Sequence, residues 1–180
     1  MATVPVPRTW VPNEFVTDTI MNGSTGIRDA LSFLLDPPGC QCWRSTAQSI
    51  PNNTVTAVSL DQEDFDNDGM HNPASNPTRI TCVTPGRYQV SGAVPYDVGT
   101  TGNREARIMK NGVGSSINGG RYLIAAPGGA ALLAVVPTLE VALLAGDFLE
   151  LIAFQTNGTA LNTTAINGVF PIIRVRRVGA

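Results

Sequence analysis

The sequence predicts an all-β antiparallel sandwich preceded by an N-terminal arm with one short helix. From Cys40 onward, about eight to ten short β-prone runs follow one another at regular spacing, and Gly and Pro residues punctuate them. Several runs alternate apolar and polar residues. In one of them Tyr88 and Val90 share a face while Arg87 and Gln89 share the other, which is the period expected of a sheet with one buried side.

Two dipeptides predict where strands turn back on themselves. The Pro-Gly pair between residues 80–84 and 87–94 combines a fixed φ with steric freedom, and it predicts a β-hairpin or a bent strand pair. Asn111-Gly112 predicts a second hairpin, because both residues tolerate positive φ.

Composition favours an oligomer and argues against nucleic acid as the main ligand. The 180 residues suffice for one domain and an arm, and hydrophobic residues make up 43% against 14% charged residues. The run at residues 148–154 is apolar on both faces, which predicts burial against its own sheet on one side and against neighbouring subunits on the other. The net charge is −2 with no basic run, so Arg174, Arg176 and Arg177 are expected to pair with acids or to face solvent.

Few residues suggest reactive chemistry. Cys40, Cys42 and Cys82 are expected to be free thiols, and one histidine, His71, argues against a Cys/His metal centre or a hydrolytic triad. We therefore expect no enzymatic activity and no required cofactor. No charged and apolar leader opens the chain, and Pro and Gly interrupt the most apolar stretch, at residues 122–145. These features predict a soluble protein, made in a cytoplasm, without a membrane partner.

The first 39 residues predict an attachment arm, and residues 40–180 predict a head domain. Closely spaced prolines exclude a helix in residues 1–18 and favour an extended segment. Trp10 and Phe15 on such a segment are costly to leave in water, so we expect them to dock on another surface.

Asp18 is expected to cap a helix that runs to about Leu35, with its firm part beginning near Thr25. Apolar residues recur on one side of this helix at helical spacing, and the Asp36-Pro37-Pro38-Gly39 segment stops it. The helix is too short to be stable alone. A bundle of helices from several subunits, or packing on its own β-domain, would cover its apolar side.

An acidic segment offers a candidate metal site. Asp64, Asp66 and Asp68, followed by Gly69, match the first positions of a calcium-binding loop. Ser75 stands where such a loop places its bidentate glutamate, and no helix is predicted beside it. Two hypotheses remain: a calcium site, or an acidic turn that is solvated or hydrogen-bonded.

Four runs in order resemble the complement-type globular head of the tumour necrosis factor-like superfamily: Ile80 to Gly92, Ile108 to Gly112, Leu144 to Leu151, and Asn167 to Phe170. The resemblance covers roughly residues 43–178. It implies a ten-stranded jelly roll that assembles as a compact homotrimer. We expect the contact between copies to use aromatic and aliphatic residues of these strands, namely Tyr88, Phe148, Leu151, Ile152, Phe154 and Phe170.

Residues 9–14 and 27–38 are similar to the opening of small virion structural proteins in tailed phages of actinobacteria, which join a short attachment segment to a trimeric jelly roll. An arginine-rich, lysine-poor composition agrees with that source. The resemblance implies a homotrimer on the virion surface with major capsid or tail proteins as partners. The residues expected to attach it are Trp10, Phe15, Ile27, Leu31 and Leu34.

Two positions on the virion stay open. Capsid decoration is favoured, because the short arm leaves no room for a long shaft. The alternative is a minor tail or fibre protein whose head binds a host receptor or glycan, for which Tyr96, Tyr122 and the acidic segment are the candidate residues.

Overall fold

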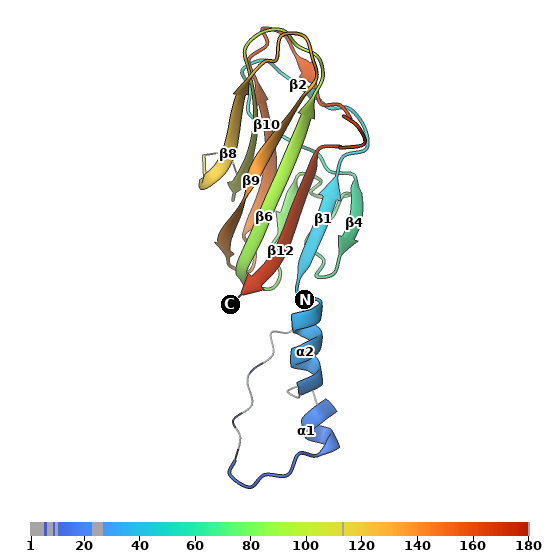
Figure 1. Cartoon of the computed structure of the whole chain (residues 1–180), viewed down its shortest axis with the longest axis vertical. Helices are drawn as coiled ribbons and strands as arrows, with labels where there is room; N and C mark the ends of the chain where they lie inside the picture. Colours follow the sequence, from blue (N-terminus) through green and yellow to red (C-terminus); the bar gives the residue numbers. More distant parts are fainter. Residues whose placement is uncertain (1–5, 7–8, 10, 23–26, 113, 180) are drawn as a thin grey trace.

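The computed structural model describes residues 6, 9, 11–22, 27–112 and 114–179. Two short helices lie below a β-sandwich (Figure 1). The elements are α1 (Asp18–Asn22), α2 (Ile27–Leu35), β1 (Gly39–Trp43), β2 (Ser49–Ile50), β3 (Thr56–Ala57), β4 (Gln62–Asp66), β5 (Arg79–Thr81), β6 (Gly86–Tyr96), β7 (Asn103–Lys110), β8 (Ser116–Ala125), β9 (Leu132–Leu143), β10 (Phe148–Gln155), β11 (Leu161–Asn162) and β12 (Ile172–Gly179).

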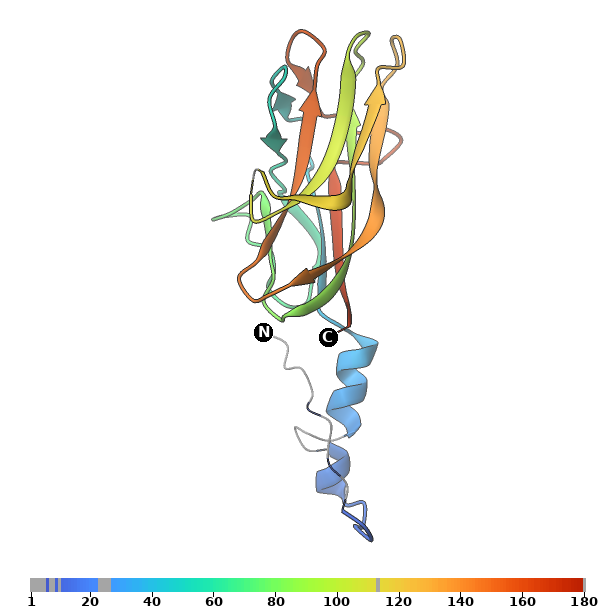
Figure 2. The ribbon, with the colours of Figure 1, turned by 90° about the vertical axis from the view of Figure 1, so that its left-hand side faces the viewer.

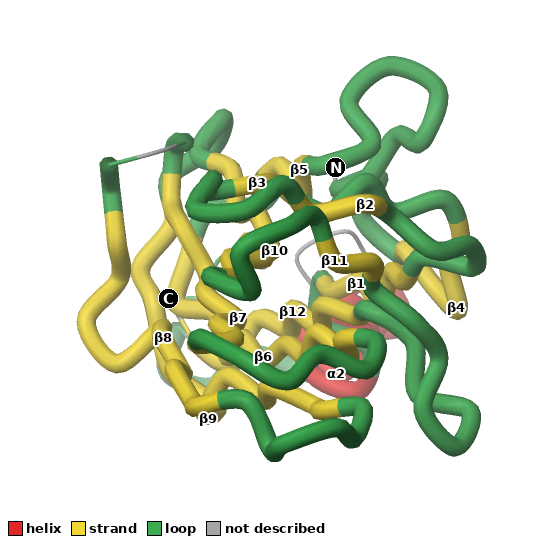
Figure 3. Tube along the Cα trace, turned by 90° about the horizontal axis from the view of Figure 1, so that it is seen from above, coloured by secondary structure: helices red, strands yellow, loops and turns green. Residues whose placement is uncertain are grey.

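Ten of these strands build the two main sheets, which confirms the predicted antiparallel jelly-roll sandwich. Sheet I has the order β4-β1-β12-β6-β9. Sheet II has the order β3-β10-β7-β8, with β5 also paired to β10. A small third sheet pairs β11 with β2, and Figure 3 shows the layers from above.

The hairpin predicted at Pro85-Gly86 is wrong. β5 pairs with β10 in sheet II, whereas β6 pairs with β12 and β9 in sheet I, so the segment between β5 and β6 crosses from one sheet to the other. The second turn is confirmed. β7 pairs with β8 across Asn111 and Gly112, whose φ angles are 57° and 95°.

The core lies between the inner faces of the two sheets. Val90 and Val94 of β6 are buried there, as the period of two predicts, and they join Leu149 and Leu151 of β10 in one apolar cluster. At Gly92 the backbone of β6 lies close to β10 of the opposite sheet, since a Cβ at this position would lie 3.0 Å from a methyl carbon of Leu151. The sheets therefore pack with little spare volume at this point.

A buried tyrosine links the two sheets. Tyr96 ends β6 in sheet I, and its hydroxyl donates a hydrogen bond to the Glu105 carbonyl of β7 at 2.5 Å. The same hydroxyl accepts one from the Phe154 amide of β10 at 2.9 Å. Because Tyr96 is fully buried, it is a structural residue and not an exposed receptor-binding aromatic, which corrects one of the sequence-based candidates.

The arm leaves the head at one end, called the base here, and α2 projects away from the sandwich in both side views (Figures 1 and 2). The Thr17 hydroxyl, rather than the predicted Asp18, accepts the hydrogen bond from the Ile20 amide that caps α1. Val11 and Glu14 close a turn through a 3.1 Å backbone hydrogen bond, so the described part of the arm is not simply extended.

We predict that Tyr96→Phe lowers the free energy of unfolding by about 1–3 kcal/mol, because it leaves the buried Glu105 carbonyl and Phe154 amide without their shared partner. Urea denaturation measures the change. Tyr122→Phe is the matched control, since Tyr122 lies on the surface of β8, and it should alter stability by less than about 0.5 kcal/mol. Equal effects of the two substitutions would contradict the structural role of Tyr96.

Candidate functional site: an assembly surface

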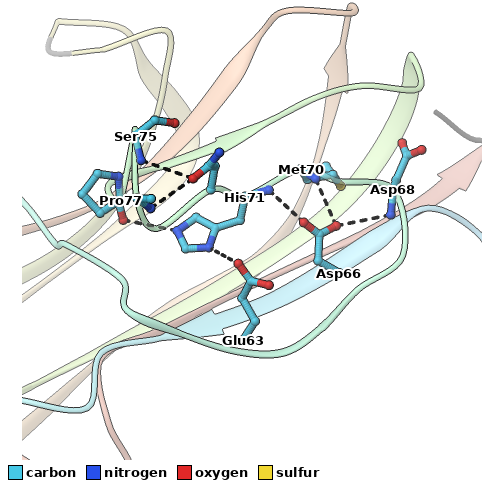
Figure 4. Close-up of polar contacts among 9 residues, drawn as sticks. Glu63, Asp66, Asp68, Met70, His71, Ser75 and Pro77 are labelled. Atoms are coloured by element: carbon cyan, nitrogen blue, oxygen red, sulfur yellow. Dashed lines mark hydrogen bonds and ion pairs between the residues drawn. The ribbon is translucent and has the colours of Figure 1, made fainter.

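The acidic segment holds its own backbone. The Asp66 carboxylate accepts hydrogen bonds from three amides of the following turn: those of Asp68 at 3.2 Å, Met70 at 3.0 Å and His71 at 2.9 Å (Figure 4). Asp68 is buried, and its carboxylate accepts a hydrogen bond from the Thr84 amide at 3.1 Å. These contacts tie the turn after β4 to the segment that precedes β6.

Asp64 is engaged elsewhere. Its carboxylate accepts hydrogen bonds from the Trp43 indole at 3.0 Å and from the Gln41 amide, both on β1. Across the described residues, no three His, Cys, Asp or Glu side chains are arranged to hold a metal ion. The geometry therefore favours the hydrogen-bonded acidic turn over the calcium site at Asp64, Asp66 and Asp68.

A thiol and an imidazole meet beneath the same turn. All three cysteines are free and buried. The His71 imidazole lies 2.7 Å from a Glu63 carboxylate oxygen (Figure 4). Hydrogen bonds, first with Cys40 and then with His71, lower the pKa of Cys42 to about 6 against the opposing effect of burial. Because Cys42 has no exposed surface, this pair is not presented to a substrate.

Three of the predicted interface residues are interior to one chain. Tyr88, Leu151 and Ile152 have no exposed surface, so they offer nothing for a second copy to contact, and their assignment is corrected. The Tyr88 hydroxyl donates to the Thr84 carbonyl at 2.5 Å. At Leu151 and Ile152, therefore, residues of the same chain cover both apolar faces of β10. Phe148, Phe154 and Phe170 are half-buried and stay interface predictions.

The outward face of sheet II is largely closed. Met109 and Ile152 on that side are fully buried, and Glu105 has no exposed surface although it is charged. Arg107 and Arg121 form ion pairs with Glu105, the latter at 2.7 Å. The two guanidinium groups compensate the negative charge of the buried Glu105 carboxylate within the chain. Apart from the exposed Leu123 on its edge strand β8, this face therefore has little surface to offer a partner.

The outward face of sheet I is open, and we call it the open face. The cross-strand pairing aligns outward-facing side chains of sheet I in two rows that run across the open face. An apolar row farther from the base contains the half-buried Trp43, the buried Ile172 and Ala93, and the exposed Val135. A polar row nearer the base contains Arg176, Gln89 and Glu140. The face thus combines an apolar row that is exposed at its β9 end, at Val135, with a polar margin, and protein contacts share this combination.

A groove of about 340 Å³ lies at the β1 side of the open face. Its walls include an aromatic pair, since the Trp43 and Phe170 rings lie 4.8 Å apart between centroids. A hydrogen-bonded chain forms its polar side: Arg174 donates to Gln41 at 2.7 Å, and Gln41 donates to Asp64. These bonds hold Arg174, and the bond from the Trp43 indole to Asp64 holds Trp43, so the groove is preformed.

The arm exposes the apolar residues predicted for attachment. Phe15 is 88% exposed, and Ile27, Leu31 and Leu34 are exposed on α2. Trp10 lies outside the described residues. Neither α1 nor α2, the two helices of the described chain, has the length and apolar run needed to cross a membrane.

Sequence reasoning missed Trp43, Gln41 and Arg174 as members of one surface. They belong to the first and last strands, which are more than a hundred residues apart, and no local spacing brings them together. The available signal was the alternation on each strand, because Gln41 and Trp43 alternate with the buried Cys40 and Cys42.

We predict that the single imidazole of the chain titrates far above its ordinary range. Burial alone lowers the pKa of His71, but hydrogen bonds with Cys42 and Glu63 outweigh it and raise the pKa to about 9. The imidazole should therefore remain protonated through neutral pH, as proton NMR of the one histidine would measure. Glu63→Gln should lower this pKa, whereas Glu140→Gln, on the open face, should not.

The raised pKa also fixes the sign of a stability effect. The stability gained from protonating His71 is fully present below about pH 6.5, the unfolded value, and is lost as the pH rises through about 9. Glu63→Gln should therefore destabilise the protein by on the order of 1 kcal/mol at pH 6 and by less at pH 10. A histidine midpoint at or below 6.5 would contradict the assignment.

Comparison with known proteins supports the fold. No protein-family model and no curated protein sequence matches the chain. Similar solved structures include the globular domain of zebrafish complement 1qA protein, with 12% identity and a TM-score of 0.56, covering 78% of this chain and 97% of that one. Murine APRIL at pH 5.0 has 13% identity and a TM-score of 0.59, with 78% and 98% covered.

Eiger TNF from S. frugiperda has 9% identity and a TM-score of 0.55, with 79% of this chain and 94% of that chain covered. Identities this low show a shared fold and not a shared activity. The chain therefore has the jelly-roll fold of tumour necrosis factor-like and complement-type globular domains, as the resemblance in its sequence implied.

Proposed function

We propose that the protein is a non-enzymatic structural component of a bacteriophage virion, a homotrimer that decorates the capsid. The head at residues 40–180 projects from the particle, and the arm at residues 1–39 attaches it. The observation that carries this proposal is the described part of the arm, in which α1 and α2 stand away from the sandwich (Figure 2) and Phe15, Leu31 and Leu34 are exposed to water.

The open face supports assembly of the heads. A closed ring of three identical chains needs two different patches on each copy, because contacts around a threefold axis are heterologous. The open face with its Trp43–Phe170 groove supplies one patch. The edge strand β8 supplies the other, with the exposed Leu123 on the outward side of sheet II and the exposed Tyr122 on the opposite side of the strand. Phe170 is the predicted interface residue that fits this arrangement best.

The receptor-binding alternative, in a minor tail or fibre position, has less support. Of its candidate residues, Tyr96 is buried, and the acidic carboxylates are engaged by donors of the same chain. Tyr122 is exposed, but it is more simply used in the contact between heads.

We predict that Val135→Asp converts the trimer to a monomer, because it places a charge in the apolar row of the open face. Light scattering would show a roughly threefold lower mass, with the circular dichroism of the fold retained. Val98→Asp is the matched control, since Val98 is an equally exposed valine in the loop after β6, and its trimer should persist.

Phe148→Asp distinguishes the two sheets. Phe148 lies on the outward face of sheet II, where the Arg79 guanidinium covers its ring at 4.1 Å. If Phe148→Asp dissociates the trimer and Val135→Asp does not, the contact uses the outward side of β10 in place of the open face, and the proposed interface is wrong.

We predict that deletion through Leu35 leaves a folded trimer that no longer joins particles. The deletion removes α1, α2 and the exposed apolar residues of the arm and leaves every strand intact. Co-sedimentation with particles of the encoding phage measures attachment, and labelling of the full chain locates it on capsid or tail. Undiminished attachment of the shortened chain would overturn the role of the arm.

A further inference from the structure

Helix α2 presents an apolar stripe that its own chain leaves uncovered. Ile27, Leu31 and Leu34 follow the four-then-three spacing of a helix-to-helix seam. Leu31 is 51% exposed and Leu34 is 72% exposed. Nine residues make a helix of about 14 Å, and isolated helices of that length are unstable in water. The stripe therefore needs a partner.

The head is not that partner. The contact that α2 makes with the sandwich is on another side, where the Arg177 guanidinium lies 5.0 Å from the centroid of the Phe33 ring. At about 100° per residue, Phe33 lies roughly 120° around the helix axis from the stripe. This excludes, for the described helix, the alternative in which its apolar face packs on its own β-domain.

The junction between helix and head fixes the direction of α2. The Asn67 side chain accepts a hydrogen bond from the Gly39 amide at 2.7 Å and donates to Asp36 at 2.8 Å and to the Pro37 carbonyl at 3.1 Å. The Arg177 amide donates to the Pro38 carbonyl at 2.8 Å. Two prolines also restrict the backbone here. The stripe is therefore held in a set orientation beneath sheet I.

We propose that three α2 helices, one from each copy, pack their stripes against one another as a short parallel bundle beneath the heads. This inference rests on the proposed homotrimer. α2 leads directly into β1, a strand of the open face, so a contact between heads through that face brings the α2 helices of neighbouring copies together.

Two further properties favour a second copy over a different protein as the partner. The stripe contains no ionisable residue, and the charged Arg28 lies about 100° from Ile27, which is the pattern of a self-associating helix. Tethering by the heads also raises the effective concentration of the helices to the millimolar range, so a helix of nine residues can associate.

The bundle divides the arm into two parts with different tasks. Residues 27–35 form a stalk that joins the copies, and residues 11–22, at the far end of the arm in Figure 1, form a tip. Phe15 and Val16 are exposed on the tip. Attachment then belongs to three copies of the tip, and Ile27, Leu31 and Leu34 serve the contact between copies.

Cysteine cross-linking of the full chain tests the bundle. Leu34→Cys places a thiol in the stripe, and Ser32→Cys places one about 160° away on the same helix. The three natural cysteines are buried, so they contribute little background. Under mild oxidation, Leu34→Cys should form covalent dimers at least about tenfold faster than Ser32→Cys, at a rate independent of protein concentration. Equal rates in a trimeric protein would overturn the bundle.

A mass measurement separates this inference from the proposed function. If both variants are trimers by light scattering and neither cross-links quickly, the bundle is wrong and the trimer of heads stands. If the natural chain is a monomer, the trimer and the bundle both fall. The Leu34→Cys/Val135→Asp double variant adds a further test. If this double variant loses both the fast cross-linking and the trimer mass, the heads position the helices.

Discussion

The pairing of the first strand, β1, with the last strand, β12, is the constraint on which the rest of the structure depends. β1 and β12 run antiparallel from Gly39 opposite Arg176 to Trp43 opposite Ile172. This pairing seats the last strand in the middle of sheet I, places the root of the arm beside the end of the chain, and aligns Gln41 with Arg174 so that the groove acquires its polar side. Without it, neither the open face nor the direction of α2 would be defined.

The two faces of the sandwich differ in how they handle charge. On sheet II, Glu105 is enclosed between two arginines, and apolar neighbours such as Met109 are covered by the chain itself. On sheet I, Arg174 and Arg176 remain at the surface next to a partly exposed aromatic pair. A protein that closes one face and leaves the other open has a defined side for contact, which is the physical basis of the trimer proposed above.

Local signals in the sequence predicted local structure well. Alternation around Tyr88 and Val90 identified the buried side of β6, and Asn111-Gly112 identified the hairpin between β7 and β8. The prediction from Pro85-Gly86 was wrong, because the same turn residues occur in hairpins and in connections between two sheets. The strand that pairs with β5 is β10, which lies more than sixty residues later in the chain. The open face was out of reach for the same reason, since its residues meet only through β1–β12 pairing. Burial by the chain itself at Leu151 and Ile152 was mistaken for burial by a neighbour.

The position of the last strand has a practical consequence for displaying foreign peptides on the head. β12 ends at Gly179 at the base, next to the root of the arm (Figure 1). A peptide fused after β12 would emerge at the base and would compete for space with the proposed stalk. The turn between β8 and β9, at the opposite end of the sandwich, faces outward, and a Gly128-Gly129 pair with positive φ already tolerates unusual backbone there. Cargo inserted in that turn would be carried at the end of the head farthest from the base.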